Sequence, residues 1–369
     1  MAVRNNSEFY RGKRKKTGPV LIITIVVLAL IAFVALVFYG LQKYIVISNN
    51  GLRLDIPILS DGTQVKDDDG NVQRTFKQAD AEIEIGEPDY SNISPVAGAA
   101  LKEMKAVYIP AADVTQSGVE AKLAAKADDV NAVVLDVKTT TGMLVWKSEA
   151  NLAKGYATSG TVDLKPIVSS LKGQGMYVAV RLCCFADNAL ATRYTQGVLR
   201  TTEGEAYSDG NGAWLDPTNS AVQSYLTELC KELADMGVDE IILLGMRLPD
   251  VSGMTYAYSK AATSEQTPVT ALSGFAINIA RNMRNSGAKL SVQITSQAAL
   301  TDGVDNVTGQ SAELFFKIFD RVYCTADVDT AADKVSAAED YIELGDVNKR
   351  LVPMCYGSAP ETDCWVIME

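Results

Sequence analysis

Eight short apolar segments, separated by segments with helical patterns, follow one another from residue 105 to the end of the chain. Each apolar segment is nearly continuous, as expected of a parallel strand that is buried on both faces. Strands that alternate with helices predict an α/β fold with a parallel sheet. The eight segments are KAVYIPA, NAVVLDVK, MYVAVRLCCF, DEIILLGMRLP, KLSVQITS, DRVYCT, RLVPMCYG and CWVIM.

Residues 104–369 match the length of a (β/α)8 (TIM) barrel, which is about 250 residues. The rival fold is an open doubly wound sheet, but no glycine-rich phosphate loop follows the first strand. The stretch YGSAPETD leaves room for at most one helical turn between the seventh and eighth strands, and no helix follows the eighth. We therefore expect a barrel that is incomplete at its C-terminal helices.

An uncharged run extends from Thr17 to Gln42, and its core is PVLIITIVVLALIAFVALVFYG. A helix over residues 18–41 is long enough to cross a hydrocarbon core of about 30 Å. The apolar region of a secretory signal peptide is shorter, and no A-x-A cleavage site follows the run. We favour an uncleaved transmembrane signal anchor, with a cleaved signal peptide as the alternative.

The residues before this run set its orientation. Residues 1–17 hold six Lys or Arg against one Glu, so the positive-inside rule keeps this basic tail in the cytoplasm and places the C-terminal domain outside the cell membrane. The tail's charge of +5, within a total of −11, leaves −16 for the rest of the chain. An outer domain this acidic is a poor candidate for binding nucleic acid.

Residues 42–103 are expected to form an extracellular stalk. YIVIS, NNG and LRLDIPI predict a strand, a tight turn and a second strand. The run from Asp67 to Asp69 suggests calcium, but no glycine stands at the sixth position of an EF-hand loop and no Glu closes it. A solvated turn is the simpler interpretation, so we predict neither a metal site nor a cofactor.

The chain has no histidine, so any acid–base chemistry must use carboxylates, Lys, Tyr or Cys. The six cysteines form no CxxC pair, which argues against a zinc or thioredoxin-type site. An exported chain can form disulfides, and Cys355 and Cys364 are the candidates for a short bridge. Buried free thiols are the alternative.

In barrels of this kind the site lies at the C-terminal ends of the strands. We take three acids there as candidate catalytic groups and five further residues as candidates for substrate binding. The acids are Asp136, Asp187 and Asp216, and the others are Lys138, Arg181, Trp214, Arg247 and Gln293.

Simpler roles exist for several of these residues. Asp136 can be a strand-end carboxylate paired with Lys138 or Arg181, and Arg247 can be a structural ion-pair partner. Trp214 can cover the core as a loop aromatic instead of stacking on a sugar.

The motifs NAVVLDVKTTTG, MYVAVRLCCFAD, WLDP and GVDEIILLGMRLP occur in this order. They resemble the successive motifs of a family of bacterial glycoside-hydrolase-like proteins, many of them surface-exposed, whose barrel is related to the alpha-amylase type. The resemblance covers roughly residues 104–300, and more loosely the remainder. It implies carbohydrate, or a cell-wall polymer, as the partner.

In that family the fourth strand typically resembles DEIQFDYIRFP, with which Asp239, Glu240, Ile241, Arg247 and Pro249 agree. Leu244 stands at the position of the family's acid, and Gly245 at that of the neighbouring aromatic residue. Relatives also carry an acid near the position of Gln293. The resemblance therefore implies that the fourth strand keeps most of the family's motif but lacks the acid at its centre.

Glycoside hydrolysis normally needs two carboxylates, so three hypotheses follow. The first is a degenerate barrel, a pseudoenzyme that binds glycan or serves in the cell envelope. The second is an active hydrolase whose carboxylates have moved to Asp136, Asp187 or Asp216, and the third is a purely structural surface protein. Under the first, Leu244 points into the barrel mouth and Arg247 lies near Asp136 or Arg181.

Overall fold

The computed structural model describes most of the C-terminal part of the chain and short segments before it. The described residues are 28, 45–48, 51–54, 65–66, 72–73 and 101–368, the last without 126–128, 157, 211, 260–265 and 343–344. The basic tail, nearly all of the predicted anchor at 18–41 and most of the predicted stalk lie outside them. Among the described residues, no helix is long and apolar enough to cross a bilayer.

The chain divides into two units, residues 1–87 and 88–369. In the first unit, β1 (Ile45–Ser48) pairs antiparallel with β2 (Gly51–Leu54), and Ser48 lies opposite Gly51. The two predicted strands are therefore confirmed, and the residues of the predicted turn lie outside the described part of the chain. A second short antiparallel pair joins β3 (Val65–Lys66) to β4 (Val72–Gln73).

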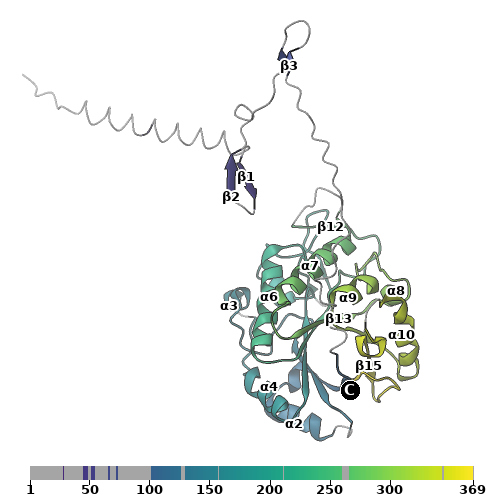
Figure 1. The fold of residues 1–369 in the computed structure, drawn as a ribbon. Helices are drawn as coiled ribbons and strands as arrows, with labels where there is room; N and C mark the ends of the chain where they lie inside the picture. Colours follow the sequence, from purple (N-terminus) through teal and green to yellow (C-terminus); the bar gives the residue numbers. More distant parts are fainter. Residues whose placement is uncertain are drawn as a thin grey trace, which may run out of the picture. The chain divides into compact units, whose positions relative to one another are not determined.

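The second unit is a closed barrel of eight parallel strands surrounded by helices, as the alternating pattern predicts (Figure 1). Neighbours in sequence are neighbours in the barrel, and the last strand pairs with the first. The strands are β5 (Lys105–Ile109), β6 (Ala132–Lys138), β7 (Tyr177–Cys183), β11 (Glu240–Leu244), β13 (Lys289–Ile294), β14 (Val322–Thr325), β15 (Leu351–Tyr356) and β16 (Trp365–Met368).

Three of the helices between these strands begin directly after a residue whose side chain caps them. Asp163, Asn219 and Thr267 each accept a backbone N–H of the first turn that follows, which satisfies a donor that the helix itself leaves free. The main helices are α2 (Gln116–Ala124), α4 (Leu164–Gly173), α6 (Ser220–Asp235), α7 (Pro268–Met283), α9 (Ala312–Ile318) and α10 (Ala331–Ala337).

Two helices end earlier than their patterns predict. The amphipathic segment SGVEAKLAAKADDV at residues 117–130 predicts a longer helix than α2, which ends at Ala124; acids at positions 128 and 129 would oppose the negative end of the helix dipole. The segment TAADKVSAAEDYIELG at residues 330–345 likewise predicts one helix, but the helix changes at Ala338 into the 3-10 turn η6 (Ala338–Tyr341).

Short elements that the sequence analysis does not anticipate lie mostly in the loops at the carboxyl ends of the strands. They are α3 (Asn151–Tyr156), α5 (Asn188–Ala191), α8 (Gln297–Thr301), α11 (Val347–Arg350), the two-residue strands β8 (Arg200–Thr201), β9 (Ser208–Asp209), β10 (Gly212–Ala213) and β12 (Tyr256–Ala257), and the turns η4 (Ala111–Asp113) and η5 (Val328–Thr330).

The barrel is incomplete at its C-terminal end. Residues 357–364, all of them described, connect β15 to β16 without a helix. The helical layer is therefore thinner here than elsewhere, and β16 is held mainly by its pairing with β15 and β5.

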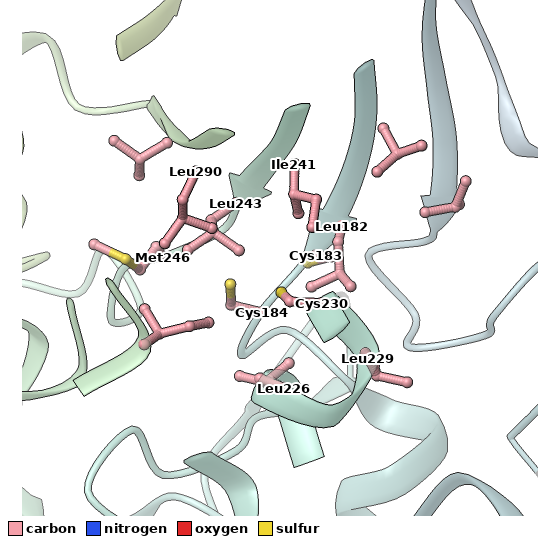
Figure 2. Close-up of a cluster of buried hydrophobic side chains, with 14 of the residues drawn as sticks. Leu182, Cys183, Cys184, Leu226, Leu229, Cys230, Ile241, Leu243, Met246 and Leu290 are labelled. Carbon is pink, nitrogen blue, oxygen red and sulfur yellow. The ribbon is translucent and has the colours of Figure 1, made fainter. Parts of the chain in front are cut away.

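Alternation along the strands gives the core two main clusters, beside a small third one that contains Cys355. The inner cluster fills the barrel and includes Ala106, Val134, Ala179 and Ile242. The outer cluster lies between the strands and the helices; Figure 2 shows the part where Leu182, Ile241 and Leu243 meet Leu226 and Cys230 of α6. Side chains of successive strand residues point to opposite faces, which produces both clusters from the same strands.

All six cysteines are buried and free. Cys355 packs with Ala326 and Ala331 beside α10, whereas Cys364 belongs to the inner cluster. The two thiols of the candidate bridge thus lie on opposite faces of the barrel wall. The structure therefore agrees with the alternative of buried free thiols.

The end of the barrel opposite the carboxyl ends of the strands is closed by a buried charged network. Glu240 pairs with Arg321, and the hydroxyls of Tyr177 and Tyr323 each donate to the Glu240 carboxylate at 2.7 Å. Arg321 also donates to the carbonyls of Lys102 and Lys349. The network thus connects strands from around the barrel with the segment that enters it.

Burial alone would raise the pKa of Glu240. The Arg321 charge and hydrogen bonds from Ser291, Tyr323 and Tyr177 outweigh that effect, so the pKa of Glu240 is lowered. Glu240 is therefore a buried carboxylate that stays ionised and acts structurally, at the end of the barrel far from the expected site.

Candidate functional site

Three side chains at the carboxyl ends of the first three strands contact one another. Arg181 Nη2 donates to Asp136 Oδ2 at 2.9 Å and to Tyr108 Oη at 2.7 Å. The Tyr108 hydroxyl in turn donates to Asp136 Oδ2 at 2.7 Å. The register places Asp136 directly opposite Arg181 on the neighbouring strand. We call Tyr108, Asp136 and Arg181 the mouth triad.

The electrostatics of the triad favour an ion pair. Burial and the Asp136 charge raise the pKa of Tyr108, against the opposing effect of Arg181. The phenol therefore keeps its proton and remains a hydrogen-bond donor. The guanidinium carbon of Arg181 also lies 4.5 Å from the centre of the Tyr108 ring, a cation–π geometry.

The triad is largely buried, and two of its polar atoms are unpaired within the described residues. The side chains of Arg181 and Asp136 are 12% and 11% exposed. Asp136 Oδ1 and Arg181 Nε have no hydrogen-bond partner in the described part of the chain. The floor of the mouth therefore has hydrogen-bonding capacity that the protein does not use.

Gln293 and Leu244 lie on the adjacent strands β13 and β11. Ser291 on β13 hydrogen-bonds to Glu240 inside the barrel. Gln293 stands two residues later on the same strand, so its side chain also faces the barrel interior, nearer the mouth. Gln293 is buried, and its Oε1 has no partner among the described residues. Alternation from Glu240 and Ile242 predicts the inner face for Leu244, but Leu244 is partly buried and packs against the outer cluster. The expectation that Leu244 points into the barrel mouth is therefore not met.

Lys138 and Asp187 lie elsewhere. They form an ion pair of 2.8 Å in which both side chains are completely buried. Lys138 also donates to the Cys183 carbonyl, and Asp187 caps α5 by accepting from Leu190. The backbone of Gly142 approaches Asp187 so closely that any side chain there would overlap the carboxylate. The pair holds together the loops outside the barrel wall.

Burial opposes the charged form of Lys138, but Asp187, followed by Tyr225 and Cys183, outweighs burial. The pKa of Lys138 is therefore raised. Lys138 stays charged for a structural reason, and neither member of the pair reaches the mouth in this structure.

Asp216 is also buried. One of its oxygens accepts from the backbone and hydroxyl of Thr218 at 2.8 Å, and the other accepts from the Ser259 N–H at 2.6 Å. Both carboxylate oxygens are thus used to connect two loops. This is the environment of a loop-fixing carboxylate.

Trp214 and Arg247 contact each other instead of the triad. Trp214 is buried and donates to Asp209, and the Arg247 guanidinium carbon lies 5.2 Å from the centre of its ring. Arg247 Nη1 also donates to the Leu248 carbonyl. The indole face is therefore occupied by an arginine of the same protein.

Two residues of the mouth are absent from the candidates taken from the sequence. Tyr108 stands two residues after the inward-facing Ala106, so strand alternation was a signal that could have found it. Tyr356 ends β15 and is 65% exposed. Its position at the carboxyl end of a strand was the corresponding signal.

The two cavities that stand out in the structure lie away from the mouth. One of about 370 Å³ lies on the outside, where Gln223 and Glu228 of α6 face Asn278 of α7. The other, of about 300 Å³, is lined by Trp146, Asp163 and other residues near the start of α4. Neither contains a residue of the triad, so the mouth is identified by its chemistry and its place in the fold.

The mouth offers a paired carboxylate, a guanidinium, a phenol and an amide. Planar polar groups of these kinds bind hydroxyl groups through hydrogen bonds. Within the described residues, no group of three or more potential His, Cys, Asp or Glu ligands is placed to hold a metal ion.

Comparison with one solved structure, the first of the three described here, supports the fold. The glycoside hydrolase domain of PgaB (BpsB) from Bordetella bronchiseptica is 12% identical, with a TM-score of 0.53, and the match covers 73% of this chain and 94% of that one. A hypothetical protein from Ruminiclostridium thermocellum is 22% identical, with a TM-score of 0.44 over 50% of this chain and 96% of that one. A chitinase from Chromobacterium violaceum is 14% identical, with a TM-score of 0.41 over 69% and 68%.

The comparison with curated proteins gives no match. A family model described as "Putative glycosyl hydrolase domain" matches residues 106–325, which is more than half of the chain and includes the first six strands of the barrel. The chain therefore belongs to this glycosyl hydrolase-like family.

Proposed function

We propose that this protein is a membrane-anchored, extracellular barrel that binds carbohydrate at its mouth and does not hydrolyse it. The observation that carries the proposal is the mouth triad, in which the one candidate acid near the mouth, Asp136, is engaged by Arg181 and Tyr108. A carboxylate held in an ion pair is a good acceptor for sugar hydroxyls and a poor proton donor.

The neighbouring positions support binding without cleavage. Leu244 stands where the resembled family has an acid, and leucine can neither attack an anomeric carbon nor stabilise positive charge on it. Two-carboxylate hydrolysis needs a second acid about 5–9.5 Å from the first. The other candidates, Asp187 and Asp216, are buried and committed to protein partners, so an active hydrolase would have to rearrange both loops.

The test measures binding and release separately. We expect the purified full chain to bind one or more cell-wall or storage polysaccharides in affinity electrophoresis, with no release of reducing ends. Asp136→Asn should weaken binding about tenfold, because hydrogen bonds to a charged group contribute about 1.5–3 kcal/mol. Asp235→Asn, which changes an exposed acid at the end of α6, is the matched control and should bind like the parent.

The Leu244→Asp variant restores the acid that the resembled family has at this position. A carboxylate placed in this partly buried position should lower stability, because it loses hydration without a partner. Weak hydrolysis can return if Asp136 acts as the second carboxylate. Release of sugar by the unmodified protein that disappears in Asp136→Asn would contradict the proposal and establish a hydrolase.

The anchor is the second part of the proposal, and it is supported by the uncharged run at residues 18–41 and the basic residues before it. We expect protease added to intact cells to digest the barrel and to leave an epitope placed within residues 1–17 protected. The positive-inside rule provides the reason. The opposite pattern would reverse the orientation, and a mature chain that starts near residue 41 would show that the anchor is cleaved.

A further inference from the structure

Three buried polar atoms on the inner face of the barrel near its mouth have no hydrogen-bond partner among the residues that the structure describes. They are Asp136 Oδ1, Arg181 Nε and Gln293 Oε1, from β6, β7 and β13. Buried polar groups in proteins nearly always have a hydrogen-bond partner, so three such atoms near one opening indicate a partner from outside the chain. All three residues stand in the carboxyl-terminal halves of their strands, at the same end of the barrel.

The free capacity consists of two acceptors and one donor. A hydroxyl group both donates and accepts. One hydroxyl can donate to Asp136 Oδ1 while accepting from Arg181 Nε, and a second can donate to Gln293 Oε1. Because a hydroxyl can bond to either end of an amide, this match holds for both orientations of the Gln293 side chain. A polyhydroxylated ligand therefore fits the set.

The charge of the mouth selects a neutral ligand. Asp136 and Arg181 neutralise each other at 2.9 Å. A cationic or anionic sugar would be attracted by one member of the pair and repelled by the other, so the net Coulomb energy available to a charged ligand is small.

Tyr356 provides an apolar contact for such a ligand. It ends β15 and is 65% exposed, an unusual degree for an aromatic side chain. Burial and the Asp136 charge are the main causes of the raised pKa of Tyr108, and the Tyr356 phenol adds a smaller increase. The two phenols therefore lie close enough to interact electrostatically.

Other exposed apolar side chains stand on loops at the same end of the barrel. Met143, Val251 and Val304 are exposed on the loops that follow β6, β11 and β13. The carboxyl ends of these strands all face the same end of the barrel. This end of the barrel thus presents both apolar side chains and the polar groups of the triad, the two kinds of contact that a sugar ring with an apolar face and hydroxyl edges requires.

We infer that the ligand is a neutral pyranose unit of a glycan, stacked on Tyr356, with its hydroxyls bonded to Asp136 Oδ1, Arg181 Nε and Gln293 Oε1. This inference rests on the proposed carbohydrate-binding function and names its ligand class and its stacking residue. Tyr356 takes the stacking role for which Trp214, covered by Arg247, is not placed.

The test compares variants of the full chain against three soluble probes: a neutral β-glucan, polygalacturonate as an anionic glycan and chitosan as a cationic one. We expect the parent to bind the neutral probe most tightly at physiological salt. Tyr356→Ala should lower affinity for it about five- to tenfold, because it removes the aromatic platform. Tyr356→Phe keeps the ring and should bind within about twofold of the parent.

Ile277→Ala is the matched control, since Ile277 is an exposed apolar residue on α7, away from the mouth. Gln293→Ala should lower affinity for the neutral probe because it removes a hydrogen bond while the stacking residue stays in place. The melting temperature of this variant shows whether the barrel is intact. Binding that Tyr356→Ala and Gln293→Ala both leave unchanged would overturn the inference and leave the proposed function standing. Preference for a charged probe would overturn the ligand class, and a parent that binds no saccharide would end both proposals.

Discussion

A chain that ends at residue 360 should fail to form the closed barrel. The deleted segment contains β16, whose residues pair with Met354–Tyr356 on one side and with Lys105–Val107 on the other. Without it, two barrel strands become edges with unpaired backbone groups. Trp365, Val366 and Met368 are buried, so their removal also exposes both clusters of the core. We expect loss of near-ultraviolet circular dichroism and of a cooperative thermal transition.

Two single substitutions within the deleted segment show how much stability a buried and an exposed residue of that segment contribute. Trp365→Ala removes a buried side chain and should cost about 3–5 kcal/mol of unfolding free energy. Glu361→Ala changes an exposed residue of the same segment and should change stability by no more than about 0.5 kcal/mol. A truncated chain with the parent's melting temperature would show that β16 does not close the barrel.

Arg321→Met should destabilise the barrel by about 3–5 kcal/mol, because it leaves the Glu240 charge buried without its partner. Arg321 is 1% exposed and Glu240 is fully buried. The variant also loses the hydrogen bonds from Arg321 to the Lys102 and Lys349 carbonyls. Urea unfolding at pH 7 measures the effect, and Arg284→Met, an exposed arginine at the end of α7, is the control.

Replacement of both charges should cost less than the sum of the single substitutions. In Glu240→Gln/Arg321→Met no ion is left buried, so the double-mutant cycle should give a coupling energy of more than about 1 kcal/mol. Additive single effects would mean that the two side chains act independently. That result would contradict the network as the element that closes this end of the barrel.

The pH dependence gives an independent test. The pKa of Glu240 is lowered from 4.5 in the folded protein, so its contribution to stability is complete above about pH 4.5 and is lost as the pH falls below that value. In Arg321→Met, burial without a cation should raise the pKa of Glu240, and the contribution changes sign. That variant should lose stability as the pH rises from about 4 to 7, relative to Glu240→Gln, in which the group does not titrate.

The order and kind of the barrel elements could be predicted from the sequence alone. Parallel strands buried on both faces are nearly continuous apolar runs, and all eight runs became strands in the predicted order. Helix starts at Asp163, Asn219 and Thr267 depend on a side chain and the next few backbone groups, which is local information. The missing helix between the last two strands followed from the length of one segment.

The partners of the polar residues depended on tertiary structure. Simple alternation would place Asp136 and Lys138 on the same face of β6, but the pairing with β7 shifts register between them. A bulge of this kind moves the following side chain to the other face. Asp136 therefore meets Arg181 and Tyr108 at the mouth, whereas Lys138 passes outside the barrel wall to Asp187.

The loops show the same limit. Trp214 and Arg247 are far apart in the sequence, and only the packing of the loops after β7 and β11 brings the guanidinium over the indole. Short-range patterns determined which residues form strands and helices, because those depend on periodicity and caps. The tertiary structure alone decided which polar groups have a hydrogen-bond partner among the described residues and which do not, because those partners come from strands distant in the sequence.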